Sequence, residues 1–296
     1  MRMNRLNSAG FTMIEIAISL GIIAFALVAI IGILPQGMKV SRVNREETII
    51  NQETSVLLNA ICNGDQGLDD LTNYVTAITN TQSEYLPSGK LEGTTVYGYT
   101  DSSSSPFPID SGFRIVGLLS TPKYWPIYSY KSGQPPQLMA FYSNHVVATI
   151  RAMSGSASDK APQNNLAVQQ MAFTYRLTCE VVPYGVGNPL APANSILSTN
   201  VPNSNAWDPS WVNYAAFSDW QWRSNYFRYA ANLQADLNEV RLLFRWPALP
   251  NGGLGNEGRQ VVRAVAAGPV QLFPNPTGNP AYNLYFVQPK TFVSAQ

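Results

Sequence analysis

The first sixty residues divide into an apolar stretch and an amphipathic stretch. Residues 16–34 carry no charge and consist of Ile, Leu, Ala, Val, Phe and Gly, interrupted only by Ser19. A helix rises about 1.5 Å per residue, so this stretch covers roughly 28 Å, close to the ~30 Å hydrocarbon thickness of a bilayer. The pattern predicts a helix that is long enough to span a membrane.

Beyond the apolar stretch, hydrophobic residues recur at the spacing of one face of a helix. These residues are Val40, Val43, Ile50, Leu57 and Ile61. The charged residues among them are expected mostly on other faces: Lys39, Arg42, Arg45, Glu46 and Glu53. This second half of the helix is therefore predicted to be amphipathic and to pack on a sheet.

One broken helix is expected from about Phe11 to Cys62. Pro35 removes a backbone donor and its ring clashes with the carbonyl four residues earlier, and Gly32 lies in the same turn. We therefore expect a kink or local melting at these two residues. The Asn63-Gly64 pair is a left-handed stop signal that should end the helix.

The rest of the chain changes to strand-like composition. Leu68, Leu71, Val75 and Ile78 indicate a short second helix before this change. β-Branched and aromatic runs then predict strands at residues 94–100, 112–120, 138–153, 168–182, 237–246, 259–266 and 282–288. Alternate residues from 171 to 181 should share one buried face.

A helix followed by strands indicates an α+β fold, with an antiparallel sheet laid against the N-terminal helix. Insertions are expected at about 101–110 and 183–235. The first contains four consecutive serines and predicts a surface loop. The second holds the densest aromatic stretch, residues 207–229, which is expected to pack on the sheet, with sugar or protein binding as the alternative.

Composition narrows the function classes. The 296 residues carry a formal net charge of +1, without the strongly basic stripe typical of nucleic-acid-binding proteins, so no nucleic-acid partner is predicted. The single His and the two distant cysteines, Cys62 and Cys179, do not have the spacing of a metal site. We predict no metal, no cofactor and no catalytic residues.

The same two cysteines are candidates for a disulfide bond in an oxidising compartment.

Two further motifs are interpreted as structural. The G-x-G-x-x-G sequence at residues 253–258 lacks the strand-then-helix context of a dinucleotide site and predicts a hairpin or long loop. His145 lies in the predicted strand 138–153, with no nucleophile or carboxylate at an obvious spacing. A structural or surface histidine is therefore favoured over a catalytic one.

The residues before the apolar stretch bear on topology. Arg2 and Arg5 have no acidic neighbour, so the positive-inside rule keeps the N-terminus cytoplasmic and sends the remainder across the membrane. A cleaved secretory signal is the competing interpretation, but the run is long and no A-x-A site follows it. Glu15 sits at the start of this run, and such a carboxylate is a candidate functional residue. The alternative is that it reaches headgroup water.

Residues 8–15, Ser-Ala-Gly-Phe-Thr-Met-Ile-Glu, resemble the processing site of type IV prepilins and type II secretion pseudopilins. The resemblance implies that prepilin peptidase cuts after Gly10, that Phe11 is N-methylated, and that Glu15 assists filament assembly. It implies a leader at 1–10, a transmembrane and assembly helix at 11–37, and an amphipathic helix with a β-rich, pilin-like head at 38–296. The protein would then lie in the bacterial inner membrane as a single-pass protein, with the head outside the cytoplasm.

The charges at this site complement each other. Cleavage would create an amine at Phe11, and in a packed filament the amine of a neighbouring subunit can approach the Glu15 carboxylate. A one-residue slip would leave both charges unpaired in a dry interface. We therefore expect Glu15 to set the alignment of subunits.

The expected function is that of a structural subunit, with other pilin or pseudopilin subunits, prepilin peptidase and the lipid bilayer as partners. Residues 19–27 resemble the apolar half of minor pseudopilins, and residues 239–247 more weakly resemble large prepilin-like proteins of the Verru_Chthon cassette. The alternative is a membrane-anchored adhesin or carbohydrate-binding module that uses the aromatic insertion. A membrane-tethered hydrolase would need a clustered nucleophile and base, which the sequence does not show.

Overall fold

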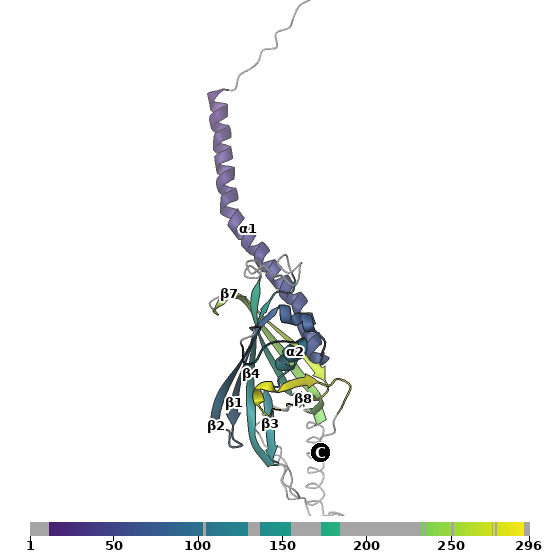
Figure 1. Ribbon diagram of the computed structural model, residues 1–296. Helices are drawn as coiled ribbons and strands as arrows, with labels where there is room; N and C mark the ends of the chain where they lie inside the picture. The colour runs from purple at the N-terminus through teal and green to yellow at the C-terminus, as the bar shows by residue number, and fades with distance from the viewer. Residues whose placement is uncertain are drawn as a thin grey trace, which may run out of the picture. The chain divides into compact units, whose positions relative to one another are not determined.

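The computed structural model describes residues 12–102, 105–129, 137–154, 173–183, 232–233, 235–249, 252–273, 275 and 277–292. The chain divides into two compact units, Met1–Thr48 and Ile49–Gln296. A single helix runs through the boundary between them, and the second unit holds the sheet (Figure 1).

Helix α1 spans Met13–Cys62 and is assigned as helical over all 50 residues. In the first unit, residues 12–42 are exposed, which includes the whole apolar stretch. Val40 is among them, so its prediction as part of the face that packs on the sheet is wrong. Pro35 lies inside the helix, so the helix is not melted there. The kink at Gly32 and Pro35 stays a prediction.

The end of α1 is fixed by a backbone motif at the predicted stop signal. Gly64 has a φ of 60°, a left-handed conformation that costs glycine little. Its N–H donates to the carbonyl of Ile61 at 3.3 Å, and the N–H of Asp65 donates to that of Ala60 at 2.9 Å. This pair of bonds is a Schellman motif, which satisfies carbonyls that the helix end would leave without donors.

The head is built on a seven-stranded sheet in which every pairing is antiparallel. The strand order is β2-β1-β4-β5-β6-β7, with β3 paired to β4. The bounds are β1 Val75–Tyr85, β2 Leu91–Thr100, β3 Tyr124–Ser129, β4 Gln137–Arg151, β5 Thr174–Pro183, β6 Leu237–Ala248 and β7 Leu254–Ala267. A separate pair contains β8 Val270–Phe273 and β9 Leu284–Val287. The predicted α+β layout of a long apolar helix and an antiparallel sheet is confirmed.

The core of the head lies between the end of α1 and one face of the sheet. Ile50, Leu57 and Ile61 are buried in one hydrophobic cluster with alternate residues of β5 and β6. In β5 these are Tyr175, Leu177, Cys179 and Val181, as the alternation predicted. Burying an aliphatic side chain contributes about 1.5–3 kcal/mol, so this face holds the helix against the strands.

The predicted short helix at residues 68–78 is mostly wrong. Only Asp69–Asn73 form a helical turn, the 3₁₀ helix η1, and β1 begins at Val75. Val75 and Ile78 are both buried although they lie three residues apart, because the register shifts between Val75 and Ala77. This bulge gives a strand the three-residue spacing that is otherwise typical of a helix.

The predicted strand at residues 112–120 is also wrong, because Gly112–Leu119 form the helix α2. Ser111 caps this helix by accepting a hydrogen bond from the N–H of Arg114. Its buried residues include Ile115 and Leu119, one turn apart on a single face. Burial of that face outweighs the strand preference of its β-branched residues. Strands β1, β3 and β8 were not predicted.

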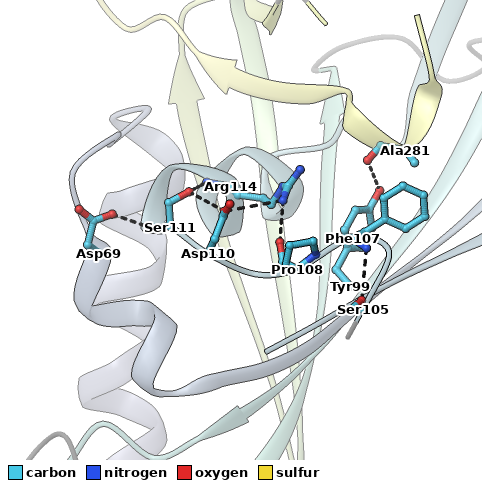
Figure 2. A network of polar contacts seen from close by, with 10 residues as sticks. Asp69, Tyr99, Ser105, Phe107, Pro108, Asp110, Ser111, Arg114 and Ala281 are labelled. Atoms are coloured by element: carbon cyan, nitrogen blue, oxygen red, sulfur yellow. Dashed lines mark hydrogen bonds and ion pairs between the residues drawn. The ribbon is translucent and has the colours of Figure 1, made fainter. Parts of the chain in front are cut away.

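A polar network fastens α2 and the loop before it to the rest of the head (Figure 2). Asp69 accepts the N–H of Gly112 at 3.0 Å, and Arg114 donates to the carbonyl of Pro108 at 2.6 Å. Tyr99 of β2 donates its hydroxyl to the carbonyl of Ala281 at 2.8 Å. The described part of the predicted insertion at 101–110 is thus held by specific contacts at its C-terminal end.

Candidate functional site

The start of α1 is organised by a reciprocal pair of hydrogen bonds between Thr12 and Glu15. The backbone N–H and the hydroxyl of Thr12 both donate to Oε2 of Glu15 at 2.8 Å. The N–H of Glu15 is in turn 3.3 Å from Oγ1 of Thr12. This is a capping box, in which an N-cap threonine and a glutamate three residues later satisfy each other's free donors.

The capping box fixes one oxygen of the Glu15 carboxylate. Both hydrogen bonds that the carboxylate accepts from Thr12 go to Oε2, and Oε1 makes no hydrogen bond to any other residue that the structure describes. Gly10 and Phe11, the predicted cleavage and methylation residues, lie outside the described residues. The role of Thr12 was not predicted, although a Thr followed three residues later by Glu before an apolar run is the signal for a capping box.

The helix that follows has the character of a membrane span. Of the helices in the described part, α1 alone is long and apolar enough to cross a bilayer. None of its apolar stretch is buried in the protein. A core helix of a soluble protein would be mostly buried, so this helix exposes an apolar surface that water disfavours.

A second carboxylate of α1, Glu53, lies in the head unit and is 2% exposed. Its Oε1 accepts the N–H groups of Met153 at 2.8 Å and Ser154 at 3.2 Å. Its Oε2 accepts the hydroxyl of Tyr175 on β5 at 2.6 Å. The prediction that charged residues of the amphipathic half lie mostly on other faces is wrong for Glu53, and Glu46 is buried as well. Helical spacing could not reveal the donors that make the burial of Glu53 tolerable.

The environment of Glu53 shifts the pKa of its carboxyl group. Burial raises the pKa of this carboxyl above the usual value of 4.5, and the hydrogen bonds from Tyr175 and residues 153–154 oppose the shift without cancelling it. Burial and the adjacent carboxylate raise the pKa of Tyr175 well above 10, so its hydroxyl remains a donor. Glu53 therefore ties α1 to the chain after β4 and to β5.

The two cysteines belong to the same core. Both are free thiols, with Cys179 buried on β5 and Cys62 half-buried at the end of α1. Burial raises the pKa of both thiols. The structure brings these residues, 117 positions apart in the sequence, into one hydrophobic cluster. Their disulfide stays a prediction.

The other candidate motifs fall in ordinary structural positions or outside the described chain. His145 is exposed on β4, as a surface histidine, and is paired in register with Thr81. Residues 254–258 of the glycine motif form the start of β7, which pairs antiparallel with β6, so the predicted hairpin is confirmed. Among the described residues, no group of three or more His, Cys, Asp or Glu side chains could hold a metal ion. The aromatic stretch at 207–229 lies outside the described residues.

No family model, no curated protein and no solved structure matches this chain.

Proposed function

We propose that this protein is a pilin-like or pseudopilin-like subunit, inserted in the bacterial inner membrane and assembled into a type IV pilus or type II secretion filament. Prepilin peptidase removes residues 1–10, and Phe11 becomes the methylated N-terminal residue. The head lies outside the cytoplasm. In this proposal the chain is a substrate of enzymes and a structural component.

The observation that carries the proposal is the division of one helix between two environments. The half that begins with the Thr12–Glu15 capping box is apolar and wholly exposed, and the half that contains Ile50, Leu57 and Ile61 is covered by a sheet. A subunit with this division can move its apolar half from lipid into a bundle of identical helices while the head stays folded. The Gly10-Phe11 sequence motif adds a processing signal at the appropriate end.

Glu15 has a specific role in this mechanism. The capping box holds the carboxylate at the first turn of the helix and leaves Oε1 for a donor from another chain. A carboxylate and an amine about 4 Å apart attract by roughly 4 kcal/mol at an effective dielectric near 20. The amine of a neighbouring Phe11 is the proposed donor, and pairing with it sets the axial position of each subunit.

Intact-mass analysis of the membrane-extracted protein tests the proposal. The expected mass corresponds to a chain that begins at Phe11 and carries one added methyl group. A chain that retains Met1 would contradict processing at Gly10. A chain that begins after Leu34 would show that the apolar stretch is a removable secretory signal, and the filament proposal would then be wrong.

A further inference from the structure

Three arginines form a row across three adjacent strands of the sheet. Arg176 of β5 pairs with Arg245 of β6, and Arg245 pairs with Arg259 of β7. Their neighbours along β5 and β6 are buried in the core, so the arginines lie on the opposite face. Adjacent strands are about 4.8 Å apart, which makes the row roughly 10 Å long. Like charges directly opposite one another are destabilising in a sheet, so the row has an energetic cost.

The described residues do not neutralise this row. Arg176 donates to the backbone carbonyl of Gly252 at 2.7 Å, which leaves its charge uncompensated. Arg245 and Arg259 are exposed, and among the side chains that the structure describes, which do not include that of Glu257, no carboxylate forms an ion pair with either of them. The row is therefore a localised positive site.

A second row on the same face shows the opposite arrangement. Glu180, Arg241 and Arg263 align across the same three strands, four residues further along. Glu239 forms ion pairs with Arg241 and, at 3.7 Å, with Arg263, and Lys123 forms one with Glu180 at 2.8 Å. Each strand residue rises about 3.3 Å, so this neutralised row lies roughly 13 Å from the first.

The residues between the rows indicate the chemistry of the partner. Thr178, Leu243 and Val261 form the intervening row, and Val261 is 49% exposed. Arginine beside exposed apolar side chains is typical of protein interfaces. The carboxylates of Glu180 and Glu239 would repel the continuous phosphates of a nucleic acid. This combination favours a discrete acidic segment of a protein.

We propose that the row of Arg176, Arg245 and Arg259 binds an acidic helix of a partner protein, with carboxylates at positions i, i+4 and i+7. Along a helix axis, the residues at i+4 and i+7 lie about 6 and 10.5 Å from residue i. These distances are close to the ~4.8 and ~9.6 Å that separate the second and third arginines from the first. The helix axis runs across the strands, and each guanidinium can bind a carboxylate with two parallel hydrogen bonds. Apolar residues beside the carboxylates pack on Leu243 and Val261.

A fluorescent helical peptide with Glu at i, i+4 and i+7 and Leu beside each Glu is the probe. It is titrated with the full-length protein in detergent micelles, and binding is followed by fluorescence anisotropy. The double variant Arg245→Gln/Arg259→Gln should weaken binding about tenfold or more, because two charged hydrogen-bonding pairs are lost. Arg263→Gln is the matched control on the same strand and face, and it should change the affinity by less than about twofold because Glu239 already pairs with Arg263. Circular dichroism establishes that both variants are folded.

Three results would overturn the proposal. Equal losses in the double variant and in Arg263→Gln would show general charge attraction. Equal binding of a peptide with Gln in place of Glu would show that carboxylates are not recognised. Tighter binding of inorganic polyphosphate than of the peptide, lost in the same double variant, would make the row a site for phosphate polymers. None of these results depends on whether the protein assembles into filaments.

Discussion

Glu15 and Glu53 are carboxylates of the same helix that are stabilised in different ways. Glu15 is bound by its own first turn, through Thr12, and is exposed at the surface of its unit. Glu53 is buried and bound by groups that lie 100 or more residues away in the sequence, at Met153, Ser154 and Tyr175. The local contact leaves a carboxylate oxygen for another chain, whereas the distant contacts use both oxygens within the head.

This difference indicates that the half of α1 that contains Glu53 is required for the stability of the head, whereas the half that contains Glu15 is not. An unpaired buried carboxylate costs several kcal/mol, so Glu53 requires its partners in every folded molecule. Glu15 is exposed and needs no hydrogen-bond donor from the head, so a donor from another subunit can pair with its remaining oxygen. We therefore expect changes at Glu53 to alter stability and changes at Glu15 to alter assembly.

The largest effect is expected for Glu53→Ala. Removal of the carboxylate leaves the Tyr175 hydroxyl and two backbone N–H groups without an acceptor, which should lower the free energy of unfolding by about 3–5 kcal/mol. Urea unfolding of a truncated chain of residues 39–296 measures this change. This chain lacks the apolar half, and we expect it to be soluble and folded.

Two variants serve as controls for this prediction. Glu47→Ala removes an exposed carboxylate of the same helix and should change stability by no more than about 0.5 kcal/mol. Glu53→Gln keeps an acceptor oxygen and should cost far less than Glu53→Ala. If Glu47→Ala and Glu53→Ala destabilised the chain equally, Glu53 would not hold α1 to the sheet.

Glu15→Gln should leave insertion and processing intact and reduce incorporation into filaments about tenfold or more. Gln is less costly than a carboxylate in lipid, so insertion persists, while the proposed amine of a neighbour loses its partner in an apolar interface. The amount of this protein in sheared filaments measures assembly, and an immunoblot that separates precursor from mature protein measures processing. Normal assembly of fully processed protein would mean that Glu15 only reaches headgroup water.

Thr12→Val sharpens the same experiment. It removes the hydroxyl of the capping box and keeps the carboxylate, at a cost of about 1 kcal/mol in local helix stability. Assembly should fall less than for Glu15→Gln, because the charge remains. An equal loss in both variants would assign the effect of Glu15 to helix capping.

The pH dependence of stability should also distinguish Glu53. Because burial raises its pKa in the folded head, the folded state takes up a proton at higher pH than the unfolded chain does. The stabilising contribution is complete below the unfolded pKa and is lost as the pH rises through the folded pKa. Relative to Glu53→Gln, the unmodified 39–296 chain should lose stability as the pH rises above the usual carboxyl pKa of 4.5 and through the raised pKa of the folded head. Parallel stability curves for the two chains would refute this assignment.

The smallest effect concerns thiol reactivity at the other end of the buried half. Because burial raises the pKa of both thiols, little thiolate is present, and Cys179 should resist a disulfide reagent until the head unfolds. Cys62 is half-buried and should react first. Glu53→Ala should speed the labelling of Cys179 if the carboxylate holds α1 in place. A protein with no titratable thiol after denaturation would instead show that the two cysteines pair.

Local pattern alone determined the long apolar helix, its end at Gly64, the alternating buried face of β5 and the helix-then-strands order of the α+β fold. Each of these depends on residues within a few positions of one another, where spacing and turn chemistry are decisive. The capping box of Thr12 and Glu15 was equally local and could have been predicted.

Tertiary structure decided the features that depend on which distant residues meet. The bulge at the start of β1 and the packing of α2 reversed two predictions, because pairing with β4 and burial in the core override local spacing. The burial of Glu53 depends on Tyr175 and on the chain after β4. The row of Arg176, Arg245 and Arg259 exists only through the registers of two strand pairs. Strand register is set by burial and by connections between residues far apart in the sequence, and it is the register that places these arginines side by side. The net charge of +1 contains no information on that placement.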